Sequence, residues 1–263
     1  MRTGRTCFLR MCGAFLVMGT LTAAIRAEES NAPERGAVEI SRCQTIDQPG
    51  RYIVVTNLKA SGDCLVIKAD NVTIDLNGLT LNGDGSGTGI KGPPLPPQGG
   101  MLAFGTTVRN GYITHFARAT DLTGTTNVTV DAVHAVSNGD GIMLAIGIVR
   151  GCFAHLNSGK GISIFDGLVT GNLVVGNGTG IAVVEAAVVT GNEASGNTTG
   201  IDAMGLGSGL SHNVVDGNKE VGLQVRCPAN LSDNTAVGNG PEDAPMNLVL
   251  IGKKCLNSGN LAP

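Results

Sequence analysis

Tryptophan is absent from the sequence, and all aromatic residues together make up only 3% of its 263 residues. Charged residues are also scarce, at 15%, whereas glycine occurs 40 times. A core in such a chain must consist of Val, Ile, Leu and Ala, and this much glycine argues against a helical protein. The composition is typical of many short strands that are joined by tight turns.

Long apolar runs are also missing, except near the N-terminus. Three arginines among the first ten residues precede an apolar stretch over residues 11–25, and Ala27 ends a sequence of the cleavage-site type. We interpret residues 1–27 as a secretory signal peptide because the stretch is short for a membrane span; an uncleaved anchor is the alternative. No other segment is apolar enough to span a bilayer, so we expect a secreted or periplasmic protein.

A surplus of positive charge is likewise absent, because the chain holds 18 Lys and Arg against 21 Asp and Glu. Four of the arginines and none of the acids lie in residues 1–27. The remainder has 14 basic and 21 acidic residues, a net charge of −7. This balance gives no support for binding nucleic acid.

Cysteine is sparse after residue 27, where five residues remain. A secreted chain can form disulfides, and two cysteines lie near each end of the repeats described below. We therefore predict the pairs Cys43–Cys64 and Cys227–Cys255, with Cys152 as a single, buried structural thiol. There is no C-x-x-C pair and no Cys/His cluster with zinc spacing, so neither a metal site nor a cofactor is predicted from cysteine.

An internal repeat of about twenty residues runs through residues 65–240. Each unit has three short apolar segments and two recurring Asn positions. A unit of this size cannot enclose a core alone, but it can when the chain winds as a coil and each strand pairs with its equivalent one turn above. Crossovers between parallel strands are nearly always right-handed. The sequence therefore predicts an all-β fold, a right-handed parallel β-helix of about eight to nine coils with capped ends.

The recurring Asn residues are expected to shape the turns. Asn and Gly tolerate left-handed backbone angles, and stacked Asn side chains can bond turn backbone that the sheets leave unpaired. We expect one inward-facing ladder, made of Asn172, Asn192, Asn213 and Asn234. A second turn is expected to be lined by Asn157, Asn177, Asn197, Asn218 and Asn239.

The ends and one insertion interrupt the repeat. A β-helix has an open sheet edge at each end, which needs a cover. Residues 28–64 are predicted to form an N-terminal cap with the first strand, and residues 241–263 a C-terminal cap. Residues 91–100 contain four prolines and must leave the coil as a loop, either a spacer or a functional loop.

Two sequence stretches resemble a known superfamily. Residues 64–90, CLVIKADNVTIDLNGLTLNGDGSGTGI, resemble the opening coils of secreted right-handed β-helix proteins of the pectate-lyase-like superfamily. The later N-x-x-x-x-N-G-T-G-I coils are similar to the repeats of polysaccharide lyases, mannuronan epimerases and NosD-like periplasmic proteins. The resemblance implies a carbohydrate-active or carbohydrate-binding role. The active-site motifs of these enzymes do not carry over: the nearest match to the epimerase DPHE is DAVH at residues 131–134, which lacks Pro and Glu.

Aligning the coils places one group of chemically useful side chains on the outside. Arg109, Asp131 and Arg150 are expected to stack on three successive coils. The neighbouring strand presents four further side chains on the same coils: Tyr112, His134, Phe153 and His155. Such a group suits β-elimination or epimerisation of a uronic acid, with an arginine neutralising the carboxylate and His134 or Tyr112 as the base. Aromatic side chains are also natural platforms for sugars. The alternative is a surface ladder, in which the Arg-Asp-Arg set is worth under ~1 kcal/mol and His134 is merely exposed.

Asp166 and Glu185 form a second candidate, since each follows the first apolar residue of its coil by four positions. They are expected to lie on adjacent coils within ~5–8 Å. Such a pair could act as acid and nucleophile in glycoside cleavage, bind substrate or hold Ca²⁺. Two solvated turn acids are the alternative.

The sequence therefore favours a secreted β-helix protein that binds polysaccharide without turnover, or serves as a surface or periplasmic structural module. The alternative is a carbohydrate-active enzyme, a lyase or C5-epimerase acting on uronic acid polymers. The expected partner is a polysaccharide, acidic polymers included. A groove along the predicted active face, walled by the 91–100 loop, would favour the enzyme; a flat face would count against it.

Overall fold

The computed structural model describes residues 36–94 and 103–263, and the structural statements below refer to these residues. The predicted signal peptide and residues 95–100 of the predicted loop lie outside them. Among the described residues, no helix has the length and apolarity needed to span a membrane.

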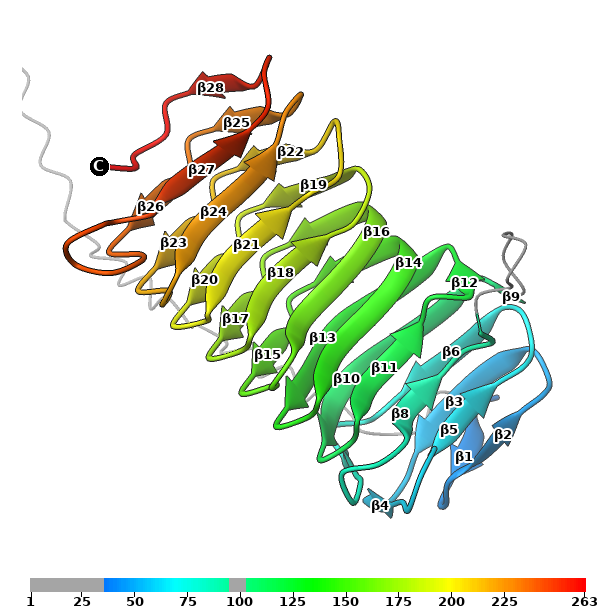
Figure 1. Cartoon of the computed structure of the whole chain (residues 1–263). Coiled ribbons are helices and arrows are strands. Elements are labelled where there is room, and N and C mark those ends of the chain that lie inside the picture. Colours follow the sequence, from blue (N-terminus) through cyan, green and yellow to red (C-terminus); the bar gives the residue numbers. More distant parts are fainter. Residues whose placement is uncertain (1–35, 95–102) are drawn as a thin grey trace, which may run out of the picture. The chain divides into compact units, whose positions relative to one another are not determined.

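The described residues form one unit, in which the chain winds as a parallel β-solenoid of about ten turns (Figure 1). Each strand pairs with the equivalent strand one turn away, and these pairings are parallel throughout the described residues. The predicted all-β fold class is confirmed.

Each turn contributes to three sheets. The first sheet contains β2 (Gln44–Ile46), β5 (Leu65–Ile67), β8 (Thr88–Lys91), β11 (Arg118–Leu122), the first halves of β14 (Asp140–Arg150) and β16 (Lys160–Thr170), β18 (Thr179–Val183), β21 (Thr199–Ala203), β24 (Val221–Arg226) and β27 (Leu248–Ile251).

The second sheet contains β1 (Val38–Ile40), β3 (Gly50–Val54), β6 (Val72–Asp75), the first halves of β10 (Thr106–Thr114) and β13 (Val128–Val136), the second halves of β14 and β16, β19 (Ala187–Thr190), β22 (Gly209–Ser211), β25 (Asn230–Ser232) and β28 (Leu256–Ser258).

The third sheet contains β4 (Leu58–Lys59), β7 (Thr80–Asn82), the second halves of β10 and β13, β15 (Phe153–His155), β17 (Leu173–Val175), β20 (Glu193–Ser195), β23 (Val214–Asp216) and β26 (Thr235–Val237). A separate short pair joins β9 (Ala103–Phe104) to β12 (Thr125–Thr126).

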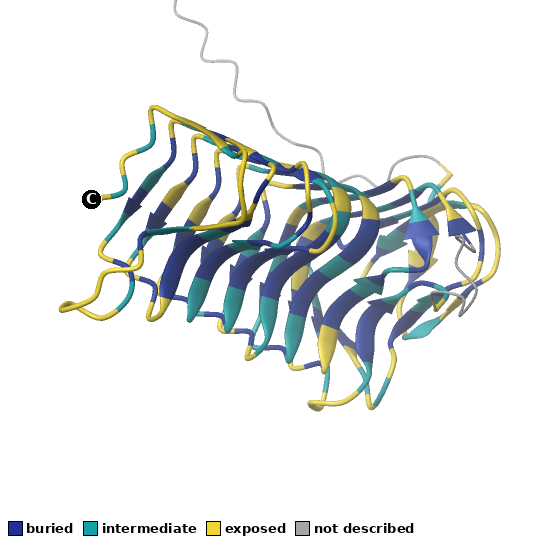
Figure 2. Ribbon diagram, turned by 45° about the horizontal axis from the view of Figure 1, so that its top comes forward, coloured by how far each residue is buried: buried dark blue, intermediate teal, exposed yellow. Residues whose placement is uncertain are grey.

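The core consists of stacked aliphatic columns. Side chains alternate between inside and outside along each strand, and the parallel register places equivalent residues over one another. Ile162, Ile181 and Ile201 form one such column on the first sheet, and all three are fully buried. Burial of a large aliphatic side chain contributes about 1.5–3 kcal/mol. Figure 2 shows that buried residues recur along the strands throughout the solenoid.

The predicted Asn ladders are confirmed. The backbone N–H and the Nδ2 of Asn172 both donate to Oδ1 of Asn192, at 3.0 and 2.9 Å. The Nδ2 group also donates to the carbonyl of Val149 one turn back, at 3.1 Å. The same pattern repeats along both ladders, whose residues are buried. Asn side chains thus satisfy turn backbone that would otherwise be buried without a partner.

Two ladder members at the C-terminal end were missed by the sequence analysis. Asn234 donates to Oδ1 of Asn260, and Asn239 donates to Oδ1 of Asn247. Both acceptors lie within residues 241–263, where β27 and β28 form a further regular turn. Strands β1 to β4 likewise add regular pairings before residue 65. This explains why about ten turns are present where eight to nine were predicted.

The left-handed backbone angle and the ladder hydrogen bonds come from different turn residues, whereas the sequence analysis assigned both to Asn and Gly together. In the Gly-Asn step, Gly171 and Gly191 adopt the left-handed conformation, with φ of 63° and 65°. The following Asn supplies the ladder hydrogen bonds. Ala132 and His212 occupy the equivalent position on other turns, with φ of 51° and 54°.

Both predicted disulfides are confirmed. Cys43 bonds to Cys64 and Cys227 bonds to Cys255, with Cα–Cα distances of 4.5 and 5.0 Å. Each joins neighbouring turns at one end of the solenoid. Cys152 is free and buried, as predicted, and its backbone N–H donates to Oδ1 of Asn172. Burial raises the pKa of the Cys152 thiol to about 12, so it is not a nucleophile at neutral pH.

Candidate functional site

The predicted charge ladder lies on the outward face of the second sheet. Asp75, Arg109, Asp131 and Arg150 are in register on four successive turns. Arg109 Nε donates to Asp75 Oδ2 at 2.9 Å, and Arg150 Nη2 donates to Asp131 Oδ2 at 2.7 Å. Both cations that were predicted to neutralise a substrate carboxylate are therefore bonded to carboxylates of the protein.

The predicted aromatic side chains stack on the outward face of the third sheet. Tyr112, His134 and Phe153 are in register, with ring centroids 4.5 and 5.8 Å apart. The Phe153 ring is also stacked on that of His155, at 5.2 Å and an interplanar angle of 24°. We call these four residues the aromatic ladder. It offers a run of rings on three successive turns.

The aromatic ladder is confined to β10, β13 and β15. The same column continues on later turns as Leu173, Glu193 and Val214, none of which carries a ring. Tyr112 is 44% exposed, and the other three rings are half-buried. The rings therefore form a local surface on a repetitive scaffold, accessible to a ligand that lies across the turns.

The strand that follows the predicted loop does not lie beside the aromatic ladder. β9 pairs with β12, which precedes β13 at the corner between the first and second sheets. The aromatic ladder lies on the third sheet. The charge ladder and the aromatic ladder lie on outward sheet faces. Other residues line the two cavities described next.

The second predicted pair lies on adjacent turns. Asp166 is in register with Ile146, and the backbone N–H of Glu185 donates to the carbonyl of Phe165 at 3.0 Å. Both carboxylates are exposed and line a cavity of about 440 Å³ together with Arg226. Within the described ranges, no group of three His, Cys, Asp or Glu side chains is placed to hold a metal ion.

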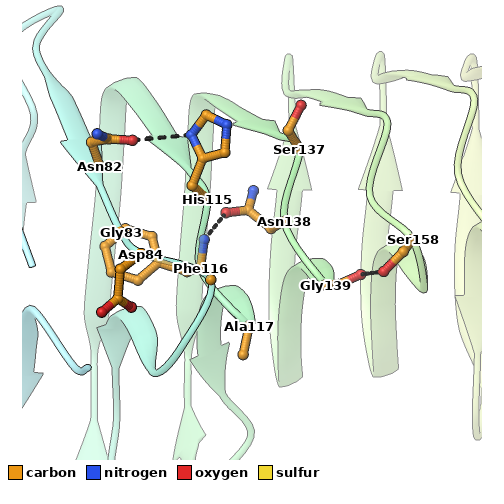
Figure 3. A pocket seen from close by; sticks show the side chains of 11 residues that line it. Asn82, Gly83, Asp84, His115, Phe116, Ala117, Ser137, Asn138, Gly139 and Ser158 are labelled. Carbon is orange, nitrogen blue, oxygen red and sulfur yellow. Dashed lines mark hydrogen bonds between the residues drawn. The ribbon is translucent and has the colours of Figure 1, made fainter. Parts of the chain in front are cut away.

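A larger cavity was missed by the sequence analysis. It has a volume of about 730 Å³ and lies at the corner between the third and first sheets (Figure 3). We call it the corner groove. Its polar lining residues are Asn82, Asp84, His115, Ser137, Asn138 and Ser158.

One wall of the corner groove comes from an unusually long turn. Residues 83–87 connect β7 to β8, whereas residues 115–117 and 137–139 make the same connection on the next two turns. Backbone hydrogen bonds hold the long turn, with Gly83 N–H donating to the Thr114 carbonyl at 2.9 Å. The extra glycine-rich residues after Asn82 were the only sequence signal for this wall.

His115 has a defined orientation in the corner groove. Its Nδ1 lies 3.0 Å from Asn82 Oδ1 and 3.1 Å from Thr114 Oγ1. An amide oxygen only accepts hydrogen bonds, so His115 donates to Asn82 in the tautomer that carries the proton on Nδ1. In that neutral tautomer, Nε2 is a hydrogen-bond acceptor.

Asp84 supplies the negative charge of the corner groove. Ser86 donates to Asp84 Oδ1 through its backbone N–H at 3.0 Å and its hydroxyl at 2.7 Å. These hydrogen bonds, with one from Ser61, lower the pKa of Asp84 to about 2. The carboxylate is therefore ionised at neutral pH.

Comparisons with known proteins support the fold. No protein-family model matches the sequence, and the comparison with curated proteins gave no match. The structure is similar to that of the Dettilon tailspike protein (gp208), at 14% sequence identity and a TM-score of 0.52. This likeness identifies the fold as a β-helix. It covers 84% of this chain and 53% of the tailspike chain, so this β-helix spans about half the length of that protein.

Proposed function

We propose that this β-helix protein binds polysaccharide on the aromatic ladder without turning it over. The observation that carries the proposal is the contiguous row of rings that Tyr112, His134 and Phe153 form on an accessible sheet face, with a tilted contact followed by an edge-to-face contact. Aromatic rings present large, rigid, amphipathic surfaces, which suit the apolar faces of sugar rings. Tyr112, His134 and Phe153 follow the solenoid axis on successive turns, so an extended glycan chain can contact several rings at once.

The pairing of the arginines favours binding over catalysis. A lyase or epimerase of uronic acids needs a cation placed at the substrate carboxylate. Arg109 and Arg150 already bond to Asp75 and Asp131 on neighbouring turns. A uronate would have to displace these partners, and the cavity that Asp75 and Arg109 line holds only about 20 Å³.

The location that we propose is extracellular or periplasmic. Disulfides persist in oxidising compartments, and the described part of the chain has two of them, one at each end of the solenoid. The signal peptide that the sequence predicts in residues 1–27 would direct the chain there. The resemblance to the pectate-lyase-like superfamily, whose members act on or bind carbohydrates, is consistent with this assignment.

The proposal is tested by affinity electrophoresis of the protein through gels that contain neutral or uronate polysaccharides. We expect at least one polymer to retard the wild type, and Tyr112→Ala or Phe153→Ala to restore most of the free mobility. Val214→Ala is the matched control, because Val214 is 45% exposed in the same outward column. Equal retardation of the Tyr112, Phe153 and Val214 variants would contradict the proposal.

Turnover is tested separately with the same polymers. A lyase leaves an unsaturated product that absorbs ultraviolet light, and an epimerase exchanges the C5 proton with deuterated solvent. We expect neither signal. Activity that is lost in His134→Ala would replace the binding proposal with the enzyme alternative.

A further inference from the structure

We propose that the corner groove binds a neutral, hydroxyl-bearing sugar residue of the polysaccharide that stacks on the aromatic ladder. The inference rests on the proposed function and specifies the sugar class. The sequence analysis instead took the outward arginines as an indication of uronic acids.

The corner groove and the aromatic ladder lie on the same turns. β10 carries Tyr112 and ends at Thr114, directly before His115 of the groove. β13 carries His134 and ends at Val136, directly before Ser137 of the groove. A glycan that stacks on the rings therefore has the groove beside it, at the end of the same strands.

The groove offers hydrogen-bonding groups of both kinds. Asn82 Oδ1 is engaged by His115, which leaves the Nδ2 group of Asn82 as a donor. His115 Nε2 is an acceptor in the neutral ring, and Asp84 accepts at its second oxygen. A sugar hydroxyl both donates and accepts, so adjacent hydroxyls can satisfy this set.

The charge of the groove discriminates against uronates. Asp84 is ionised at neutral pH, and no Lys or Arg is among the described residues that line the groove. Arg118 follows the lining residue Ala117, but its guanidinium bonds to Asp121 Oδ2 at 3.0 Å. A substrate carboxylate would meet a like charge without a compensating cation, which is costly.

At the corner that holds the groove, the residue type at the left-handed position changes along the solenoid. His115, Ser137 and Leu156 have φ of 58°, 56° and 54°, whereas the equivalent positions of the next turns are Gly176 and Gly196. The left-handed conformation costs a non-glycine residue about 1–2 kcal/mol. Three such residues border the groove and the aromatic ladder, and the same conformation also occurs at other corners, as at Ala132 and His212.

The test compares His115→Gly with His212→Gly in the full chain. Both substitutions remove an exposed imidazole from a left-handed residue, since φ is 58° at His115 and 54° at His212. His212 lies on a later turn at another corner, so its variant controls for backbone effects. The probes are soluble mannan and β-glucan as neutral polymers, and alginate and polygalacturonate as uronate polymers.

We expect the wild type to bind a neutral polymer more tightly than either uronate polymer. His115→Gly should weaken that binding about tenfold, the loss of one well-placed hydrogen bond, while His212→Gly leaves it unchanged. Asp84→Asn should bring uronate binding closer to neutral binding, because the like charge is gone and the carbonyl oxygen still accepts from Ser86.

The outcomes separate the two proposals. If Tyr112→Ala weakens binding but His115→Gly binds like His212→Gly, the groove proposal is overturned and the aromatic ladder stands. Tighter wild-type binding to uronates than to neutral polymers also overturns the groove proposal alone. If no polymer binds the wild type, both proposals fail.

Discussion

Arg150 donates from Nη2 to Oδ2 of Asp131 on the preceding turn, at 2.7 Å. The hydrogen bond and the charge of Asp131 raise the pKa of Arg150. The Arg150 side chain is nevertheless 54% exposed, so water and salt screen the pair. The pair is therefore a feature of the surface of the second sheet and contributes little to folding.

Replacing Arg150 by Ala should reduce stability only slightly, and the difference from the wild type should vanish at high salt. Binding of a neutral polysaccharide should be unchanged, because the aromatic ladder is on the neighbouring sheet. Urea unfolding at low and high salt, with affinity electrophoresis, measures both effects. A loss of glycan binding in Arg150→Ala, with folding intact, would show that the charge ladder contacts the ligand.

The Asn ladder should respond very differently to substitution. Asn192→Ala removes the acceptor of two donors on Asn172 and the donor to the Val169 carbonyl. These groups are buried, and each one left without a partner costs about 1–3 kcal/mol. We expect the free energy of unfolding to fall by at least about 3 kcal/mol, as measured by urea denaturation.

Asn230→Ala is the control for the Asn ladder, because Asn230 is exposed at the start of β25. Its effect should stay within about 0.5 kcal/mol. If Asn192→Ala were as mild as Asn230→Ala, the ladder hydrogen bonds would not be a source of stability.

The register of the solenoid could be predicted because two features of each repeat indicate it, the apolar columns and the Asn columns. This was enough to place Tyr112, His134 and Phe153 in one outward column, as the structure has them. The end turns escaped prediction because β1 to β4 lack the Gly-Ile and Asn signatures. Asn247 was missed because it lies only eight residues after Asn239 and directly before Leu248, where the preceding turn has Gly222.

The corner groove could not be predicted, because it depends on differences between turns. Its wall exists because residues 83–87 form a longer turn than residues 115–117. The orientation of His115 depends on a hydrogen bond to Asn82, 33 positions earlier. The pairing of Arg109 with Asp75 is likewise a side-chain rotamer choice that the repeat does not encode.

The turn residues with left-handed backbone angles allow a prediction about stability, which can be tested at equivalent positions on different turns. Ala132 has φ of 51° and is exposed, so Ala132→Gly should relieve backbone strain and stabilise the protein by about 0.5–1 kcal/mol. Gly171→Ala is the reciprocal change: φ is 63°, and an added Cβ would have no neighbour within 4 Å. It should destabilise by about 1 kcal/mol.

A buried alanine on the same strand provides the contrast for Ala132. Ala135 is fully buried, and Ala135→Gly should destabilise through lost packing and added chain entropy. Thermal unfolding of the three variants measures the signs. Destabilisation by both Ala132→Gly and Ala135→Gly would mean that strain at Ala132 is negligible.

Asp202 on the first sheet should make stability depend on pH. Burial raises the pKa of Asp202, and the hydrogen bond from Gln224 Nε2, 3.2 Å from its Oδ1, only partly opposes this. The folded state therefore holds the Asp202 proton more tightly than the unfolded state does. This contribution favours folding below the ordinary pKa of 3.8 and is lost as the pH rises through the raised value.

Asp202→Asn removes the charge and keeps an acceptor for Gln224. Relative to the wild type, the variant should therefore gain stability as the pH rises from about 3 to about 7. Urea unfolding across this range measures the difference, with exposed Asp243→Asn as the control. A stability difference that is the same at both ends of the range would mean that the pKa of Asp202 is equal in the folded and unfolded states.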